Sequence, residues 1–301
     1  MRWPQRATTP MRMIEPGSLA DGLIKATDRR SPPALLHDRI AEVALAAAWV
    51  DNINDAQEIV EPHLDAVRAR LLQIRDAAEV GGHTWHIELY GSEYEWVRGA
   101  SFHDKSLDPS EQDVRARRAD IDAVLTELRK LRPVEFERAC TQVLALLGCR
   151  DPRTSPLRDD GGIDFYGQLA LQGRLNTRLP LGGIDTRTNV WLIGQAKHYP
   201  TRPIQTAVVR ELVGSVELAR TKGAIHEWAG LELRPFDATV LLVFTTGWFS
   251  SGSESLLAQS GVLSMNGAQL ATFLCDAGVG FRGDPPVYDS VTFQADLLAR
   301  D

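Results

Sequence analysis

The chain has 301 residues, with 33 basic and 40 acidic side chains and a formal net charge of −7. Hydrophobic residues make up 44% of the chain, which is enough to build a core and excludes a disordered protein. The net negative charge excludes a histone-like protein that coats nucleic acid, but it leaves room for a local basic cleft.

The cysteines and the apolar runs predict a cytoplasmic protein. The three cysteines form no CxxC pair, which argues against a disulfide framework or a cysteine zinc site. No apolar run reaches the roughly 18 residues that a membrane span needs. The N-terminal MRWPQRATTP lacks the apolar core of a secretion signal. We therefore expect no membrane partner.

The first part of the chain is predicted to be mainly helical. Residues 1–34 hold five prolines and predict a flexible arm. Apolar residues at helical spacing and one alternating segment then predict, in order, helices over 33–50 and 56–78, a hairpin over 83–98 and a helix over 110–131. Helices followed by a hairpin also fit a winged helix, and the sequence leaves that alternative open.

The remainder has the pattern of a mixed α/β domain. Apolar and β-branched runs predict strands that alternate with amphipathic helices. In chain order these are a helix over 135–147, strands over 163–171 and 190–197, a helix over 204–222, a strand over 239–245, a helix over 254–260, a strand over 262–265 and a helix over 268–276.

Four polar side chains stand where an ordinary α/β core would not place them. Glu137 lies early in a predicted helix, and Asp164 follows a double glycine at the start of a predicted strand. Gln195 and Lys197 end an apolar strand, and residues two apart on a strand point to the same face. We therefore expect a compact cluster of oxygen atoms with one cation.

This cluster suits metal-assisted cleavage of phosphodiesters. Mg²⁺ prefers oxygen ligands, and Asp164, Gln195 and Glu137 can supply them directly or through water. A bound metal activates water and stabilises charge on phosphoryl oxygens. Lys197 can lose its proton when buried, which arginine cannot do, and it is one of five lysines beside 28 arginines.

The order of these motifs resembles the Mrr-type restriction endonucleases of the PD-(D/E)xK nuclease superfamily. The segments that carry the resemblance are Phe136-Glu137, LALLG at 144–148, DGGID at 160–164, Gln195-Ala196-Lys197, VFTTGWFS at 243–250 and MNGAQL at 265–270. The resemblance covers about residues 134–278. It implies an α/β fold, restriction-endonuclease-like, with a mixed central sheet flanked by helices and a mainly helical N-terminal domain.

The resemblance also implies the roles of the site residues. It makes Asp164 the metal-binding aspartate, Gln195 with Lys197 the variant of the (D/E)xK motif, and Glu137 the acid of the helix. Glutamine replaces the second acid of the wider superfamily and removes one negative charge from the site. A long segment between Asp164 and Gln195, with Gly173, Pro180, Gly182 and Gly183, predicts an inserted hairpin loop.

Candidate contacts to nucleic acid lie close to these motifs. Arg150, Arg153 and Arg158 precede the glycine turn, and His198 follows the lysine, so we expect them to meet the DNA backbone. Plainer interpretations stand beside each of these: an ordinary turn for 160–164, a lysine at a strand end with its ammonium in water, and a solvated helix face for Glu137.

The sequence thus predicts a Mg²⁺-dependent DNA endonuclease, with Mn²⁺ as a substitute, acting in restriction or anti-phage defence. Two alternatives remain: a nuclease silent until a partner or small ligand binds the N-terminal module, and an inactive DNA- or partner-binding protein on a nuclease fold. We expect a homo-oligomer, since many enzymes that cut two strands are dimers. The predicted regions are an arm at 1–34, a sensing, specificity or oligomerisation module at 35–131, the nuclease domain at 132–280 and a C-terminal extension at 281–301.

Overall fold

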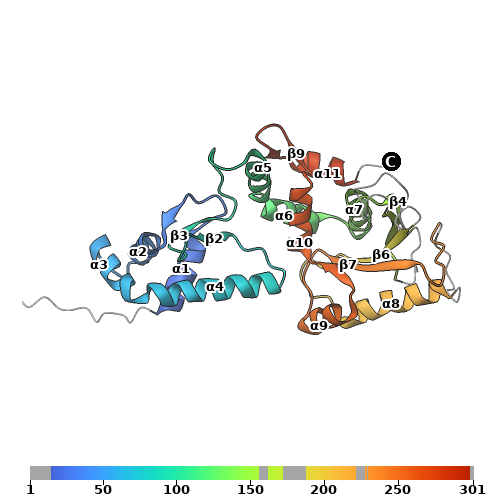
Figure 1. Ribbon diagram of the computed structural model, residues 1–301, viewed down its shortest axis with the longest axis horizontal. Coiled ribbons are helices and arrows are strands. Elements are labelled where there is room, and N and C mark those ends of the chain that lie inside the picture. The colour runs from blue at the N-terminus through green and yellow to red at the C-terminus, as the bar shows by residue number, and fades with distance from the viewer. Residues whose placement is uncertain (1–14, 156–161, 172–187, 222–227, 229, 299–301) are drawn as a thin grey trace, which may run out of the picture. The chain divides into compact units, whose positions relative to one another are not determined.

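The computed structural model describes residues 15–155, 162–171, 188–221, 228 and 230–298. The chain divides into two compact units, residues 1–119 and 120–301, which are considered one at a time below (Figure 1). Among the described residues, no helix combines the length and apolar character that crossing a bilayer requires. The predicted hairpin loop at 173–183 and Arg158 lie outside the described residues.

The first unit combines helices with a small antiparallel sheet. Its elements are α1 (Pro16–Ala26), β1 (Ala34–Leu35), α2 (Leu36–Ala46), α3 (Ile53–Val60), the 3₁₀ turn η1 (Glu61–His63), α4 (Leu64–Val80), β2 (Ile87–Tyr90), β3 (Trp96–Gly99) and α5 (Pro109–Arg118). The strand order is β1-β3-β2, with both pairs antiparallel. The hairpin of β2 and β3 follows the helices, as the sequence predicts, and the winged helix stays a prediction.

Helix α1 corrects the prediction of an arm over residues 1–34. Leu19 and Leu23 are fully buried in a core shared with α2 and α4, so this segment is part of the folded unit. Pro16 is the first residue of the helix, where its missing N–H costs nothing and its fixed φ suits a helix. The prolines that predicted an arm thus include one that begins a helix.

The helix predicted over 110–131 is two helices. The first, α5, ends at Arg118, and α6 (Ile121–Lys130) begins after Asp120, so the division between the units lies at 119–120 and not at 131. Val124 and Leu128 of α6 are buried against the core of the second unit. The amphipathic pattern continues across this boundary, so it did not reveal that α5 and α6 belong to different units.

The second unit is a mixed five-stranded sheet with helices. Its elements are α7 (Pro133–Leu146), β4 (Arg150–Thr154), β5 (Phe165–Ala170), β6 (Asn189–Lys197), α8 (Thr206–Arg220), β7 (Ala238–Thr245), α9 (Ser251–Ser260), β8 (Leu263–Met265), α10 (Gly267–Asp276), β9 (Phe281–Arg282), β10 (Val287–Tyr288) and α11 (Ser290–Leu298). The sheet order is β4-β5-β6-β7-β8, antiparallel at β4-β5-β6 and parallel at β6-β7-β8. The predicted mixed α/β fold is confirmed.

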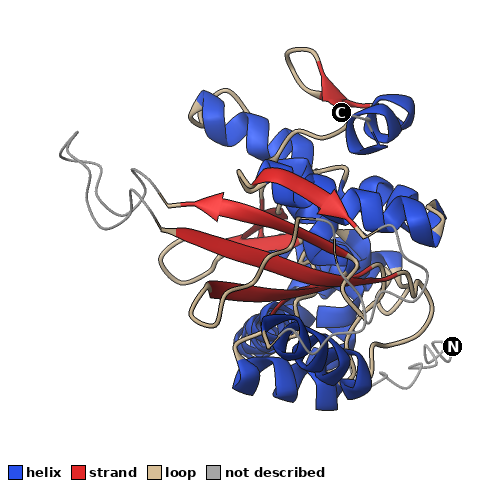
Figure 2. Cartoon of the chain, turned by 90° about the vertical axis from the view of Figure 1, so that its right-hand side faces the viewer, coloured by secondary structure: helices blue, strands red, loops and turns tan. Residues whose placement is uncertain are grey.

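Helices cover both faces of this sheet (Figure 2). One core joins the sheet to α6, α7, α10 and α11, and the other joins it to α8 and α9. Strand β6 is therefore buried on both sides, which explains its nearly continuous apolar run. Phe293 and Leu297 of α11 are buried in the first of these cores, so the C-terminal extension packs as part of this unit.

The edge strand β4 was not predicted, because its sequence Arg-Asp-Pro-Arg-Thr has the composition of a loop. Pro152 cannot donate to a ladder, and such residues are tolerated at a sheet edge. The register between β4 and β5 shifts between Arg150 and Arg153. Pairing with β5, and not local preference, makes this segment a strand.

Candidate active site

Asp164 is fixed at the point where the chain enters β5. It lies one residue before the strand, whereas the sequence placed it inside the strand. Its N–H donates to the carbonyl of Gly194 at 2.9 Å, and its Oδ2 accepts from the N–H of Ala196 at 2.6 Å. The residue is 6% exposed. The carboxylate is therefore held against the end of β6, beside Gln195 and Lys197.

Gln195 connects Lys197 to helix α8. Its side chain is fully buried. In the amide orientation that satisfies both ends, its nitrogen donates to the Val208 carbonyl at 3.0 Å and its oxygen accepts from Lys197 Nζ at 3.0 Å. Lys197 is half-buried. The predicted pair therefore projects together from β6, and the amide holds the ammonium in place.

Glu137 lies half-buried in the second turn of α7. Its carboxylate and that of Asp164 act on the same neighbour, the buried thiol of Cys140. Burial raises the pKa of this thiol well above its usual range, and the charges of Asp164 and Glu137 add to the rise. The two acids thus lie near a common point, although Glu137 comes from a different element than the other three residues.

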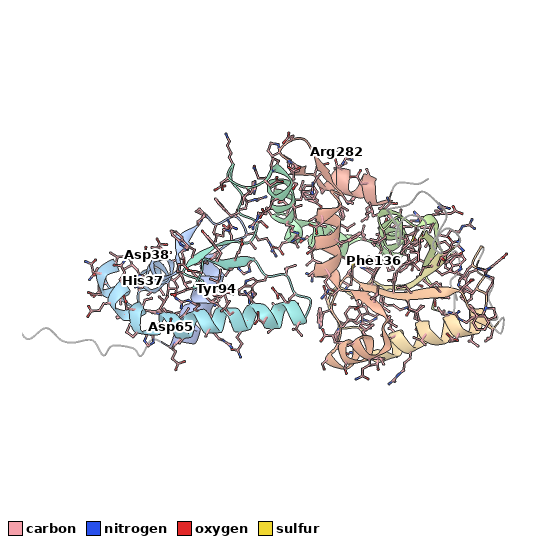
Figure 3. The ribbon with its side chains drawn as sticks, in the orientation of Figure 1. His37, Asp38, Asp65, Tyr94, Phe136 and Arg282 are labelled. Carbon is pink, nitrogen blue, oxygen red and sulfur yellow. The ribbon has the colours of Figure 1, made fainter. Side chains whose placement is uncertain are left out.

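His198 continues the cluster beyond Lys197. Its ring lies 5.8 Å from the ring of Phe136, which Figure 3 labels, and its Nδ1 is 3.1 Å from Thr246 Oγ1. Burial lowers the pKa of His198, so the neutral ring is favoured over a wider pH range. A neutral, packed histidine is a weaker contact for phosphate than a charged one.

Two of the three arginines predicted to meet DNA, Arg150 and Arg153, are exposed on β4. Arg150 pairs in register with Gln168, toward the end of β5 that is remote from Asp164. Arg153 lies opposite Tyr166, and its guanidinium binds Asp151 at 2.7 Å. Arg153 is therefore nearer to the candidate site than Arg150.

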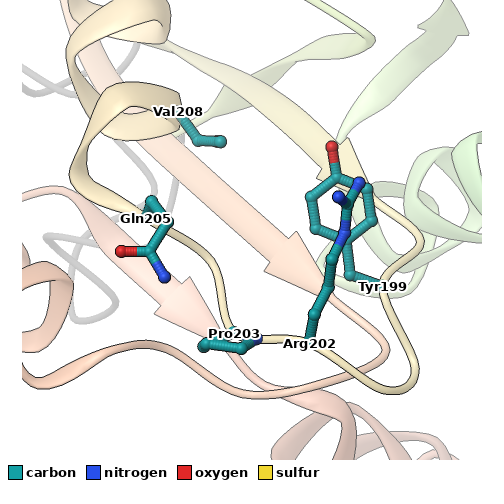
Figure 4. A pocket seen from close by; sticks show the side chains of 5 residues that line it. All are labelled: Tyr199, Arg202, Pro203, Gln205 and Val208. Carbon is teal, nitrogen blue, oxygen red and sulfur yellow. The ribbon is translucent and has the colours of Figure 1, made fainter.

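The sequence did not reveal the hollow that lies just beyond Lys197. This hollow of about 300 Å³ is lined by Tyr199, Arg202, Pro203, Gln205 and Val208 (Figure 4). The guanidinium of Arg202 stacks 3.7 Å from the centre of the Tyr199 ring. Tyr199 N–H donates to the carbonyl of Lys197 at 3.0 Å, which ties the hollow to the strand end. The cluster His-Tyr-Pro-Thr-Arg-Pro after the lysine was the available signal.

Glu211 is a second residue that the sequence did not single out. A Cβ added to Gly162 would lie 2.9 Å from Glu211 Cγ, 3.2 Å from its carboxyl carbon and 3.1 Å from the amide of Gln195. The carboxyl group of Glu211 and the amide of Gln195 therefore flank the same glycine. Gly162 also has a φ of +85°, a left-handed conformation that glycine adopts readily. No local pattern marks Glu211, since it lies on an ordinary amphipathic helix.

The donor chemistry of this cluster suits a hard divalent cation. Its polar atoms are carboxylate and amide oxygens, the ligands of Mg²⁺ and Mn²⁺. Among the described residues, no group of three or more His, Cys, Asp and Glu side chains is arranged to hold a metal ion without other donors. A cation at this site would therefore keep several waters, as Mg²⁺ commonly does.

The part of the chain that holds the candidate site is similar to a known protein family. Residues 128–274 match the family model Mrr_cat, described as a restriction endonuclease. No curated protein matches the chain. Two solved structures are similar: the MspJI restriction endonuclease in complex with a 27-mer oligonucleotide (21% identity, TM-score 0.41, covering 66% of this chain and 40% of that one) and the DNA modification-dependent restriction endonuclease AspBHI (17% identity, TM-score 0.38, covering 67% and 44%). The chain spans less than half the length of either.

Proposed function

We propose that the protein is a metal-dependent endonuclease that hydrolyses phosphodiester bonds in DNA, because residues 128–274 match the Mrr_cat restriction endonuclease model. The observation that carries this proposal is the joint placement of Asp164, Gln195 and Lys197 at one end of β5 and β6. An ordered carboxylate and an ordered ammonium are the two charges that phosphodiester hydrolysis needs.

Mg²⁺, with Mn²⁺ as a substitute, would be held by Asp164 with oxygens from Gln195 and Glu137, and when bound it would activate water and polarise the phosphate. Asp164 keeps its carboxylate oriented through the bond from Ala196 N–H. Lys197, held by Gln195, orients the attacking water or neutralises charge that develops on the phosphoryl oxygens. Burial of Gln195 keeps this pair in one geometry.

The DNA strand is proposed to continue past Lys197 into the hollow described above. Arg202 is already stacked on Tyr199, so less of its side-chain freedom is lost when it binds a phosphate. Arg153 on β4 is proposed as a second contact to the DNA backbone. His198 is proposed as a further contact, with an uncharged ring. Such contacts position the duplex without reading its sequence. The biological setting is proposed to be restriction or anti-phage defence, by a homo-oligomer that presents two such sites.

A regulated form of this activity is the second candidate. Residues 1–119 hold 15 basic and 19 acidic side chains, a net charge of −4, and the turn between β2 and β3 holds Glu93 and Glu95. Acidic residues at the tip of this hairpin would repel a phosphate backbone. This favours a protein partner or small ligand for the first unit, whose binding would release the nuclease.

Cleavage of plasmid DNA with Mg²⁺ or Mn²⁺ tests the proposal. Asp164→Asn and Lys197→Ala are each expected to lower the rate by about 10²–10⁴-fold or more, the range for loss of one catalytic group. Glu217→Gln, an exposed acid on α8, serves as the matched control and should cut normally. Cleavage by both variants at the wild-type rate would refute the site. A wild-type protein that binds DNA without cutting it under any activator would favour the inactive alternative.

A further inference from the structure

We propose that Glu211 is a third carboxylate of the metal site, beside those of Asp164 and Glu137, and that it supplies the negative charge that Gln195 lacks. This inference rests on the proposed function and adds a residue that the motif does not include. Glu211 comes from α8, three residues after Val208, whose carbonyl accepts the Gln195 amide. One turn of helix therefore brings both the anchor of Gln195 and an acid to the same place.

The amide of Gln195 is already used at both ends. Its nitrogen donates to Val208 and its oxygen accepts from Lys197 Nζ. An amide carries no charge and its oxygen has two lone pairs, of which the lysine takes one. Gln195 is thus best suited to position Lys197, and a metal would gain little charge stabilisation from it.

Glu211 can supply the negative charge that Gln195 lacks. Its carboxyl carbon and the Gln195 amide lie 3.2 and 3.1 Å from the same point above Gly162. The residue is exposed, and its carboxylate has no hydrogen-bond or ion-pair partner among the described residues. A flexible acid at the rim of the site can turn toward a cation, while the buried Asp164 stays fixed.

Gly162 makes this arrangement possible. A side chain at this position would force Glu211 to shift, because its Cβ would lie 2.9 Å from Glu211 Cγ. Asp164 follows two residues later on the same turn. The glycine, two residues before Asp164 in the chain, therefore leaves room for Glu211 beside the amide of Gln195.

Binding of Mn²⁺ to the full chain without DNA provides the test, with free Mn²⁺ measured by electron paramagnetic resonance. Glu211→Gln is expected to weaken binding by at least about tenfold, as loss of a ligand or its supporting group commonly does. Glu217→Gln is the matched control on the same helix, since its carboxylate faces Arg220 at 3.8 Å. Asp164→Asn defines the loss expected when the site itself is removed.

A charge exchange sharpens the test. Gln195→Glu combined with Glu211→Gln returns one carboxylate to nearly the same point and should restore Mn²⁺ affinity, although it releases Lys197 from its amide. Equal binding by Glu211→Gln and Glu217→Gln would overturn the inference, as would Mn²⁺ binding that Asp164→Asn leaves intact. A further outcome is that the wild-type protein binds Mn²⁺ and never cuts DNA, while Glu211→Gln binds Mn²⁺ weakly. That result would support Glu211 as a metal ligand and refute only the nuclease proposal.

Discussion

The two units treat a half-buried or buried acid in opposite ways. In the first unit, Glu88 on β2 accepts from Arg98 at 2.8 Å and from Arg115 at 2.8 Å. Burial raises the pKa of Glu88, but the hydrogen bonds and charges of the two arginines outweigh burial and hold its pKa below the usual value. In the second unit, Asp164 is more deeply buried and is held by a backbone N–H of β6.

The difference separates an acid whose charge two arginines offset from an acid that, under the proposed function, would bind a cation. Glu88 joins β2, β3 and α5 through neutralised charge, and nothing further is needed there. Asp164 shares its corner of the sheet with Glu211, an exposed acid, and with a single ordered lysine. Under the proposed function a cation would bind in this corner, and no such role is proposed for Glu88.

The largest expected effect on stability comes from the aromatic frame beneath Asp164. Phe165 is fully buried, and its ring stacks 5.3 Å from that of Phe244, over Gly194. Phe165→Ala should lower the free energy of unfolding by about 3–5 kcal/mol, measured by urea denaturation. Phe236→Ala, at a fully exposed phenylalanine of the same unit, is the control and should change little. An equal loss of unfolding free energy in the two variants would refute a stabilising role for the stacked rings of Phe165 and Phe244.

A smaller effect is expected from the ion pairs of the first unit. Glu88→Gln removes the carboxylate that Arg98 and Arg115 share, while Arg115 keeps Glu111, and it should cost about 1–2 kcal/mol of stability, since the site is partly exposed. Thermal unfolding measures this loss, with the exposed Glu93→Gln as control. Mn²⁺ binding should be unchanged in Glu88→Gln. If Glu88→Gln lowered Mn²⁺ affinity as much as Glu211→Gln does, the proposal that only the second unit binds the metal would be wrong.

The smallest expected effect is a pH dependence at His198. Because burial lowers its pKa in the folded state, the unfolded chain binds more protons than the folded chain below about pH 6.5. Stability should therefore fall as the pH drops from about 6.5 toward the folded-state pKa. His198→Gln should flatten this part of the curve of unfolding free energy against pH. An unchanged slope would mean that the ring titrates as freely when folded as when unfolded.

Much of the fold could be predicted from the sequence, because its central elements carry strong local patterns. The apolar run before Gln195 and the β-branched run at 239–245 became β6 and β7 within two residues of their predicted bounds. The amphipathic segment at 204–222 became α8 in the same way. In contrast, β4 depends on pairing with β5, and α1 depends on a core that forms with α2 and α4. Such non-local contacts leave no local signal.

The sequence by itself determined the chemical types at the candidate site and their order: an acid after paired glycines, then a glutamine and a lysine two residues apart on a buried strand. Strand periodicity alone placed Gln195 and Lys197 on one face, since that relation needs no partner. Only the tertiary structure decided that the Gln195 amide bridges Lys197 to α8, and that Glu211 lies beside them. Those contacts join residues from separate elements, whose meeting is fixed by packing across the sheet and not by spacing along the chain.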